Sequence, residues 1–501
     1  MSTLTKRIEF QEWLPDMRQM EAPSIFAATN IWPAPQGYSP VINPSTTTDI
    51  TAGTSTIPLD ACPAYKSNGD KFLFVGSQDK LHRVSVTATV DDVTGTAYSA
   101  GTPKAGGRWD FVQWGDDIIG SNWVDPIQRI APVSATAFAV LSSATATPKC
   151  RTLASSRNFL IAGYTHDATD GTSPQRVQWC AINDPTDWVV SAVTQADTHD
   201  LLGPGGPVQR VFGGEYAVVF QENAVHRMSY VGTPAIWQFD EVVSQRGLLT
   251  PGAAAQKGDM IFYLSQDGFE VLVNGSESQP IGANKVNNWF FENLDWSKKE
   301  AIRCAADPAT KRVFWYFPDN TNSNARNDLC LIYDYSIGKW GTMAVLGNPF
   351  PAAFANDLYG EGVLDVTWNR QTPLEKTVIE YRDNTAASAG SFASVQTGPI
   401  SLVAGRCAMV KAIKVGFAQP SAGGFPKTQV TVERLLKGGL LSFVGTTDGE
   451  TTVEQLNNRY NIRSNGWQHR FKVAWAANLT DHWRGAELSF IDIEYVPTHS
   501  R

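Results

Sequence analysis

Residues 258–275 read GDMIFYLSQDGFEVLVNG and contain two apolar runs separated by Gln266-Asp267-Gly268. Aspartate followed by glycine between two apolar runs is a strong hairpin signal, because glycine accepts the positive φ of a tight turn. The segment therefore predicts two antiparallel strands joined by a short turn. A second hairpin with a longer tip is predicted where VFWYF (313–317) precedes a polar loop and then LCLIYDY (329–335).

The same plan of apolar strand, polar turn and second strand recurs through the middle of the chain. It is found in segments that begin at Lys71, Arg108, Asn158, Pro207, Gly258 and Arg303. The units are about 40 to 50 residues long, and degenerate repeats of this length built from antiparallel strands are typical of propeller blades. Radial closure of the blades would leave few exposed strand edges. The alternative is two β-sandwiches in series.

The sequence divides into three expected parts, and the expected fold class is all-β. Residues 1–50 are predicted to form an extended N-terminal arm with the first strands, and residues 51–385 a β-propeller-like domain of short antiparallel hairpins. Small residues at 386–394 (AASAGSFAS) are typical of a linker. Residues 386–501 are predicted to form a smaller C-terminal β-sandwich, because their apolar residues alternate with period two. One helix is expected, over 285–299.

The arm is proline-rich and carries three aromatic side chains, Trp13, Phe26 and Trp32. Proline fixes an extended main chain and removes a hydrogen-bond donor, so a packed sheet is not expected there. Aromatic anchors on an extended segment can grip a neighbouring subunit. The alternative is that the arm folds back on its own chain.

The amino-acid composition excludes some classes of function. At 501 residues the chain is too long for a single ordinary core, and only 18% of its residues are charged, against about 25% in an average soluble protein. Aromatic residues, at 11%, are enriched in protein interfaces. The net charge of -8 argues against a protein that grips DNA, because each phosphate contact needs a lysine or arginine.

The cysteines and the lengths of the apolar segments indicate the cellular location. The six cysteines are scattered, without a CxxC pair, and we interpret them as buried free thiols in a reducing compartment. The N-terminus has no apolar signal segment, and no run of about 18 apolar residues is present. We therefore expect synthesis in the cytoplasm and no membrane span.

No catalytic spacing is found: GxSxG, HExxH, GxGxxG and the P-loop are all missing from the sequence. His226, His469 and His482 are dispersed, and we do not expect them to act as metal ligands or bases. The sequence predicts no catalytic residue, no metal site and no cofactor, so the protein is not expected to be an enzyme.

Two acidic motifs have structural interpretations. Asp184 and Asp187, on either side of Pro185-Thr186, are interpreted as turn residues and not as a carboxylate pair for glycoside cleavage. Residues 265–268 (SQDG) are similar to the Asp-box turns of sialidase propellers, but the downstream threonine and tryptophan of that motif are missing. A hairpin explains the segment without catalysis.

Several segments resemble the tail nozzle proteins of short-tailed bacteriophages, also called packaged-DNA stabilisation proteins. They are RVQWCAINDPTDW (176–188), GGPVQRVFGGEYAVVFQENAVHRMSYVG (205–232), WQFDEVVSQRG (237–247), and FYLSQDGFEVLVNGSESQPIG with KVNNWFF (within 262–291). Residues 10–41 are similar to the opening of these proteins.

The resemblance implies a structural virion protein that forms a hexameric ring below the portal and adaptor. Such a ring lines and closes the DNA exit channel, retains the packaged genome and opens for ejection into the host. The implied partners are other copies of the chain, the tail adaptor protein, and tail fibre, spike or needle proteins. Double-stranded DNA would pass through without sequence-specific binding. The implied location is the virion tail, after synthesis in the bacterial host cytoplasm. The family has no catalytic residues to carry over.

An acidic chain suits a channel wall that DNA slides past, since neutralised phosphates would hold the DNA back. Acidic residues on expected turns are the candidates for such a wall. They are Asp116, Asp117, Asp267 and Glu277.

Two other functions remain open. A carbohydrate-binding or depolymerising propeller of the tail is suggested by Trp109, Trp114 and Trp123, because sugars stack on aromatic rings; the alternative for these residues is packing in the blade core. The third possibility is a β scaffold in another virion part, such as a baseplate hub or a tail fibre collar.

Overall fold

The computed structural model describes most of the chain. The described ranges are 2–18, 25–41, 45–49, 58–85, 89–102, 106–307, 310–321, 327–344, 352–355, 363–369, 375–380, 393–418, 428–435, 458–475 and 487–498. For 45–49, 352–355, 363–369 and 375–380, only the main chain is described.

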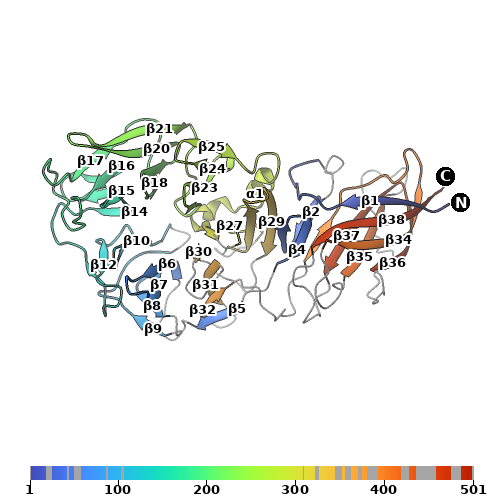
Figure 1. Cartoon of the computed structure of the whole chain (residues 1–501), viewed down its shortest axis with the longest axis horizontal. Coiled ribbons are helices and arrows are strands. Elements are labelled where there is room, and N and C mark those ends of the chain that lie inside the picture. Colours follow the sequence, from blue (N-terminus) through green and yellow to red (C-terminus); the bar gives the residue numbers. More distant parts are fainter. Residues whose placement is uncertain are drawn as a thin grey trace.

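Between residues 45 and 380, the described strands form seven antiparallel four-strand units that follow one another around a ring (Figure 1). The first strands of neighbouring units pack against each other, except that the fourth and fifth are joined by a hydrogen bond from the Arg210 side chain to the carbonyl of Ala254. The first strand of the seventh unit contacts that of the first. This arrangement is a seven-bladed β-propeller. The predicted propeller-like fold is therefore confirmed, and the alternative of two sandwiches in series is wrong for this part of the chain.

The blades follow the chain in order. The first comprises β6 (Pro58–Tyr65), β7 (Lys71–Ser77), β8 (Leu81–Ser85) and β9 (Val90–Asp92). The second comprises β10 (Asp110–Trp114), β11 (Asp117–Ser121), β12 (Gln128–Ile130) and β13 (Ala139–Val140). The third comprises β14 (Lys149–Ser156), β15 (Phe159–Asp167), β16 (Gly171–Trp179) and β17 (Asp197–Asp200). The fourth comprises β18 (Val208–Phe212), β19 (Ala217–Gln221), β20 (Ala224–Gly232) and β21 (Ile236–Ser244).

The remaining blades continue the ring. The fifth comprises β22 (Ala254–Lys257), β23 (Met260–Ser265), β24 (Gly268–Val273) and β25 (Glu277–Pro280). The sixth comprises β26 (Arg303–Asp307), β27 (Arg312–Phe317), β28 (Leu329–Asp334) and β29 (Lys339–Ala344). The seventh comprises β30 (Ala352–Ala355), β31 (Val363–Asn369), β32 (Glu375–Glu380) and β5 (Ser45–Asp49).

The ring is closed by a strand from the N-terminal side of the propeller. β5 pairs antiparallel with β32, and Asp49 stands opposite Thr377 in the register. Closure of the last blade by a strand from the beginning of the chain removes the exposed edge that β32 would otherwise present. Part of the segment expected as an arm therefore belongs to the propeller.

The C-terminal part is a sandwich of two sheets. One sheet runs in the order β2 (Ala27–Thr29), β33 (Ser394–Gln396), β37 (Gln468–Trp475) and β35 (Thr428–Leu435). The other contains β38 (Leu488–Pro497), β34 (Ala408–Phe417) and β36 (Arg459–Gly466), with β1 (Leu4–Glu9) on β38. Buried residues alternate along β36 and β37, as the period-two pattern predicted. Residues 386–392 of the expected linker lie outside the described residues.

The N-terminal arm folds back on its own chain. β1 pairs with β38 and β2 with β33. The hairpin of β3 (Ile31–Ala34) and β4 (Gly37–Pro40) lies between β29 and β38, so one ten-stranded sheet runs from the sixth blade into the sandwich. Both termini lie at the sandwich end of the molecule (Figure 1).

The expectation that the arm's aromatic residues grip a neighbouring subunit is corrected for two of them. Trp13 is 1% exposed and meets Trp289 edge-on at 5.2 Å between ring centroids. Trp32 is buried, and the guanidinium of Arg312 lies 4.5 Å from its ring centroid. Phe26 is half-buried. Because the chain's own propeller and sandwich bury both indoles, these rings are not available to another subunit.

The expected helix over 285–299 is shorter than predicted. It consists of α1 (Asn287–Asn293) followed by a 3-10 helix (Trp296–Ala301), with extended main chain at Leu294. The carboxylate of Asp16 accepts hydrogen bonds from the main-chain N–H groups of Asn288 and Trp289 at 2.9 and 2.8 Å. The arm therefore satisfies the N-terminal donors of α1, which would otherwise be unpaired.

Both predicted hairpins are confirmed. β23 and β24 are joined by the turn Gln266-Asp267, and Gly268 has a φ of +130°. β27 and β28 form the second hairpin. All six cysteines are free thiols, and four of them are buried: Cys150, Cys180, Cys304 and Cys330.

Candidate functional site

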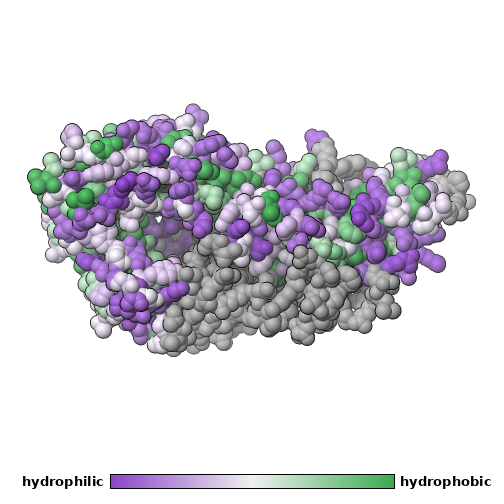
Figure 2. Space-filling model, in the orientation of Figure 1, coloured by the Kyte–Doolittle hydropathy of each residue, from purple (hydrophilic) through white to green (hydrophobic). Residues whose placement is uncertain are grey.

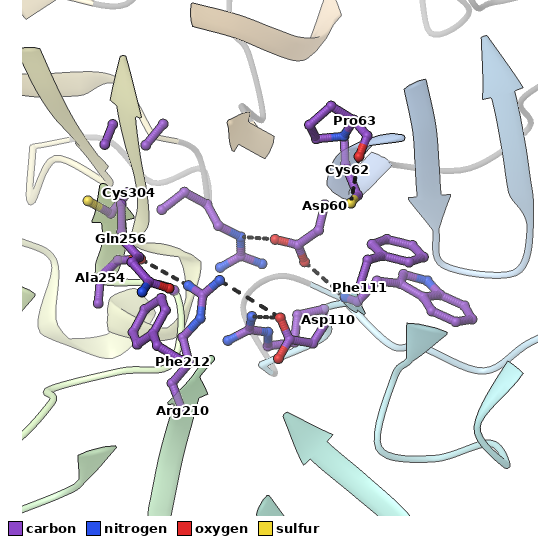
Figure 3. A pocket seen from close by; sticks show the side chains of 18 residues that line it. Asp60, Cys62, Pro63, Asp110, Phe111, Arg210, Phe212, Ala254, Gln256 and Cys304 are labelled. Atoms are coloured by element: carbon purple, nitrogen blue, oxygen red, sulfur yellow. Dashed lines mark hydrogen bonds and ion pairs between the residues drawn. The ribbon is translucent and has the colours of Figure 1, made fainter. Parts of the chain in front are cut away.

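A cavity of about 290 Å³ lies at the centre of the propeller. Its wall includes residues of the first strands β6, β10, β18, β22 and β26, which converge on it from five blades. Figure 3 shows Asp60, Asp110 and Arg210 pointing toward one another across this space. The wall is strongly charged, because Arg108 and Arg303 also line it.

One buried ion pair joins the first and sixth blades. Nε of Arg303 lies 3.1 Å from Oδ1 of Asp60. The other carboxylate oxygen of Asp60 accepts a 2.9 Å hydrogen bond from the main-chain N–H of Trp109. Arg303 also donates to the carbonyls of Glu300 and Ile302, both at 3.0 Å. Its charge and most of its donors are therefore satisfied within the chain.

The second carboxylate, Asp110, is shared between two arginines. Its Oδ2 accepts hydrogen bonds from Oγ1 of Thr152 at 2.6 Å and from the main-chain N–H of Leu153 at 2.9 Å. Its Oδ1 lies 3.3 Å from Nη2 of Arg108 and 3.8 Å from Nη2 of Arg210. One carboxylate therefore faces two guanidinium groups.

Burial acts on the charges of this cluster. Desolvation lowers the pKa of Arg210 and of Arg303. The charge of Asp110 opposes this effect at Arg210, and the charge of Asp60 opposes it at Arg303. The positive charge of Arg108 lowers both pKa values further. A guanidinium nevertheless keeps its proton at neutral pH. The described wall of the cavity thus carries three arginines against two aspartates, which leaves an excess of buried positive charge.

The four acidic candidates do not form one acidic surface. Asp116 lies in the turn between β10 and β11, where hydrogen bonds from the hydroxyl and N–H of Ser67 lower its pKa. Asp117 begins β11 and pairs with Arg129 at 2.5 Å. Asp267 and Glu277 are both exposed.

Their positions in the blades explain the separation. Strand direction alternates within a blade, so the turn between its first two strands and the turn between its last two lie at the same face of the ring. Asp116 lies in a turn of that kind, and Glu277 begins β25 directly after one. Asp267 lies in the turn between the second and third strands of its blade. Asp267 therefore lies at the opposite face of the ring from Asp116 and Glu277, and the assignment of these residues to a channel wall stays a prediction.

The three tryptophans considered for sugar binding differ in exposure. Trp109 is 1% exposed, stacks on Phe111 at 5.7 Å between ring centroids and donates from Nε1 to the carbonyl of Ser77 at 2.8 Å. It belongs to the blade core, as the alternative interpretation expected. Trp114 and Trp123 are half-buried.

Two of the three candidate histidines lie in the described part of the chain. Burial lowers the pKa of His226, and its Nε2 lies 2.9 Å from Oε1 of Gln221. His469 is fully buried in β37, and burial lowers its pKa to about 4. His482 lies outside the described residues. Among the residues that the structure describes, no group of three or more His, Cys, Asp and Glu side chains is arranged to hold a metal ion.

An exposed apolar surface lies at the outer edge of the third blade. We call it the valine surface: Val189, Val190 and Val193, which are 57%, 60% and 90% exposed. The three lie in the loop 180–196 between β16 and β17. Figure 2 shows hydrophobic residues at the left-hand end of the molecule, where β16 and β17 lie in Figure 1.

The loop is held in one shape by its own turns. Asp184 accepts hydrogen bonds from the N–H and hydroxyl of Thr186 at 2.9 and 2.7 Å, and the hydrogen bond from the hydroxyl lowers the pKa of Asp184. Asp187 accepts from the N–H of Val189 at 3.0 Å. Trp188 is buried beneath the loop and donates from Nε1 to Pro185. Asp184 and Asp187 are thus turn residues, as predicted, and they fix how the valines are presented.

Sequence reasoning missed both the arginine cluster and the valine surface. Arg108, Arg210 and Arg303 stand at or just before the first strand of three different blades, and this recurrence in the repeats was the signal that could have found them. Single valines in a loop give no comparable signal.

The comparisons with known proteins identify no family. No family model and no curated protein matches the chain. Among solved structures, a virginiamycin B lyase from Staphylococcus aureus matches with a TM-score of 0.42 and 9% identity, over 68% of this chain and 98% of that chain. The Pan2 WD40 domain from Neurospora crassa matches with a TM-score of 0.41 and 9% identity, over 68% and 96%. The propeller assignment rests on the sheet order of the chain itself. No helix among the described residues is long and apolar enough to cross a membrane.

Proposed function

We propose that this chain is a structural subunit of a bacteriophage tail nozzle, which assembles into a hexameric ring that lines and closes the DNA exit channel. The observation that carries the proposal is the valine surface. Three valines that are more than half exposed stand together on a loop whose turns are internally hydrogen-bonded. Such a surface is costly in water and typical of a protein contact site.

The position of this surface in the sequence supports the same function. The loop that presents it includes most of RVQWCAINDPTDW (176–188), one of the segments that resemble tail nozzle proteins. The residues of that segment set the loop's turns, and the valines follow directly. The resemblance and the exposed surface therefore coincide in one element.

The architecture of the propeller suits the wall of a DNA channel. Its ring is closed by β5, and polar contacts such as the hydrogen bond from Thr152 to Asp110 tie neighbouring blades together. A net charge of -8 would let DNA pass without being held. In this proposal the protein is not an enzyme, lies in the virion tail, and contacts the adaptor and the fibre, spike or needle proteins through surfaces other than the valine surface.

The mass of the purified full-length protein, alone and with its adaptor, tests the proposal. We expect a six-subunit ring, and we expect Val190→Asp combined with Val193→Asp to leave folded monomers with an unchanged melting temperature. The matched control is Val140→Asp, at another exposed valine, in β13. A chain that stays monomeric at every concentration and is missing from the particle would refute the proposal.

A further inference from the structure

The centre of the propeller holds more buried positive charge than its described neighbours neutralise. Asp60 and Arg303 form a matched pair, but Arg108 and Arg210 share the single carboxylate of Asp110. Burying a charge without a partner costs several kcal/mol. The excess therefore calls for a counter-charge that the described residues of the cavity do not provide.

The lack of a counter-charge is clearest at Arg108. Its side chain is 7% exposed, and its Nε and Nη1 are buried with no hydrogen-bond partner among the residues that the structure describes. Its Nη2 lies 3.3 Å from Oδ1 of Asp110, which is its one charged contact within the described part of the chain. A buried donor without an acceptor is unfavourable, and more so when the donor is charged.

Arg210 is satisfied on one side only. Its Nη1 donates to the carbonyls of Pro251 and Ala254 at 3.2 and 2.9 Å, which fixes the guanidinium in the wall of the cavity (Figure 3). Its Nη2 stands 3.8 Å from Asp110, beyond hydrogen-bond distance. The guanidinium of Arg210 is therefore fixed in position, and its Nη2 can still donate a hydrogen bond to a further acceptor.

The surroundings add to the positive potential. Arg151 of β14 is half-buried nearby. Desolvation lowers its pKa, the charge of Glu300 opposes that effect, and the charge of Arg108 lowers the pKa further. An adjoining cavity shares Asp110, Phe111 and Arg210 with the first and extends along β14 and β18. The charged centre is thus continuous with further open space.

We propose that the centre of the propeller is a binding site for a small phosphate-type oxyanion, held by Arg108 and Arg210. Guanidinium groups bind phosphate through paired, charge-assisted hydrogen bonds, which are stronger than neutral ones. A volume of about 290 Å³ exceeds what an anion of this size needs, since one water occupies about 30 Å³ of the liquid. The excess positive charge also disfavours a metal cation at the same place.

The test uses the purified full-length protein in phosphate-free buffer. Inorganic phosphate is titrated at constant ionic strength, with sodium chloride as the compensating salt, and thermal unfolding and calorimetric heat are followed. We expect a saturable rise in melting temperature and one site per chain, because a ligand that binds only the folded state stabilises it. Ethyl phosphate and a nucleoside monophosphate, in parallel titrations, distinguish a free anion from the phosphate group of a larger ligand.

Three variants make the test specific. Arg108→Met should melt no lower than the parent without phosphate, because it removes an unpartnered charge, and it should bind phosphate at least about tenfold more weakly. Arg210→Lys keeps the charge but removes the fork, and should also weaken binding. Arg157→Met changes a half-exposed arginine paired with Glu215 and should leave the phosphate response unchanged.

Three outcomes would overturn the proposal. They are an equal phosphate response in the parent and in Arg108→Met, a response that sodium chloride reproduces at the same ionic strength, and a response to duplex DNA but to none of the small phosphates. The monomeric valine-surface variant should respond to phosphate like the parent, so failure of the ring proposal would not affect this result.

Discussion

The indole of Trp109 lies directly against the main chain of Gly76: a Cβ atom added at Gly76 would stand 2.4 Å from Cδ1 of the ring. This contact joins the core of the first blade to the start of the second. The ring cannot move away, because it is fully buried and its Nε1 is hydrogen-bonded to Ser77. The two blades can therefore approach this closely only with glycine at position 76.

Gly76→Ala should lower the free energy of unfolding by about 2 kcal/mol or more, because overpacking a rigid core forces the main chain to shift. The near-ultraviolet circular dichroism of the tryptophans should change with it. Gly115→Ala is the control: it lies in a turn with a φ of +57° and open space around the new Cβ, so it should cost only about 1 kcal/mol. Equal effects of the two changes would contradict this account.

Asp60→Asn should destabilise the protein by about 3 kcal/mol or more, because it leaves the buried Arg303 without a counter-charge. Urea unfolding of the purified protein measures the loss. The control is Asp92→Asn, which removes the exposed pair between Lys80 and Asp92 and should cost no more than about 1 kcal/mol. A loss at Asp60 as small as that at Asp92 would mean that Arg303 finds another partner.

His469→Gln should remove part of the acid sensitivity of the protein. The folded chain holds the pKa of His469 at about 4 by burial, below the ordinary value of 6.5, so the unfolded chain takes up the proton first. The stability tied to this group is complete above pH 6.5 and falls as the pH drops toward 4, by about 1.4 kcal/mol per pH unit. Urea midpoints at several pH values should show a shallower fall in the variant. His199→Gln, at an exposed position, should keep the slope of the parent.

Trp13→Ala should lower the free energy of unfolding by about 3 to 5 kcal/mol, because it empties a fully buried site between the arm and α1. Phe26→Ala, at a half-buried position, should cost clearly less. Thermal unfolding measures both, and mass measurement shows whether assembly survives. If Trp13→Ala left stability intact but abolished the oligomer, the arm would grip a neighbouring subunit after all.

The amino-acid sequence determined the strands and their turns. Alternating and continuous apolar runs define β23, β24, β27 and β28, and Asp267-Gly268 places a tight turn between the first two. These are local signals, because strand period and turn geometry depend on residues adjacent in the chain. The expected helix was too long, because the prediction did not use Asp295, whose side chain accepts from the N–H of Ser297 and begins a separate 3-10 helix after the extended main chain at Leu294.

Only the tertiary structure decided how the repeats close and what they enclose. β5 reaches β32 from the other end of the propeller, and the arm returns to β33 and β38. Arg108, Arg210 and Asp110 meet at one point because the first strands of the blades converge on a common centre. The physical reason is that strand formation is a local property, whereas ring closure, burial of Trp13 and the balance of charge in the cavity depend on which distant segments the closed ring brings together.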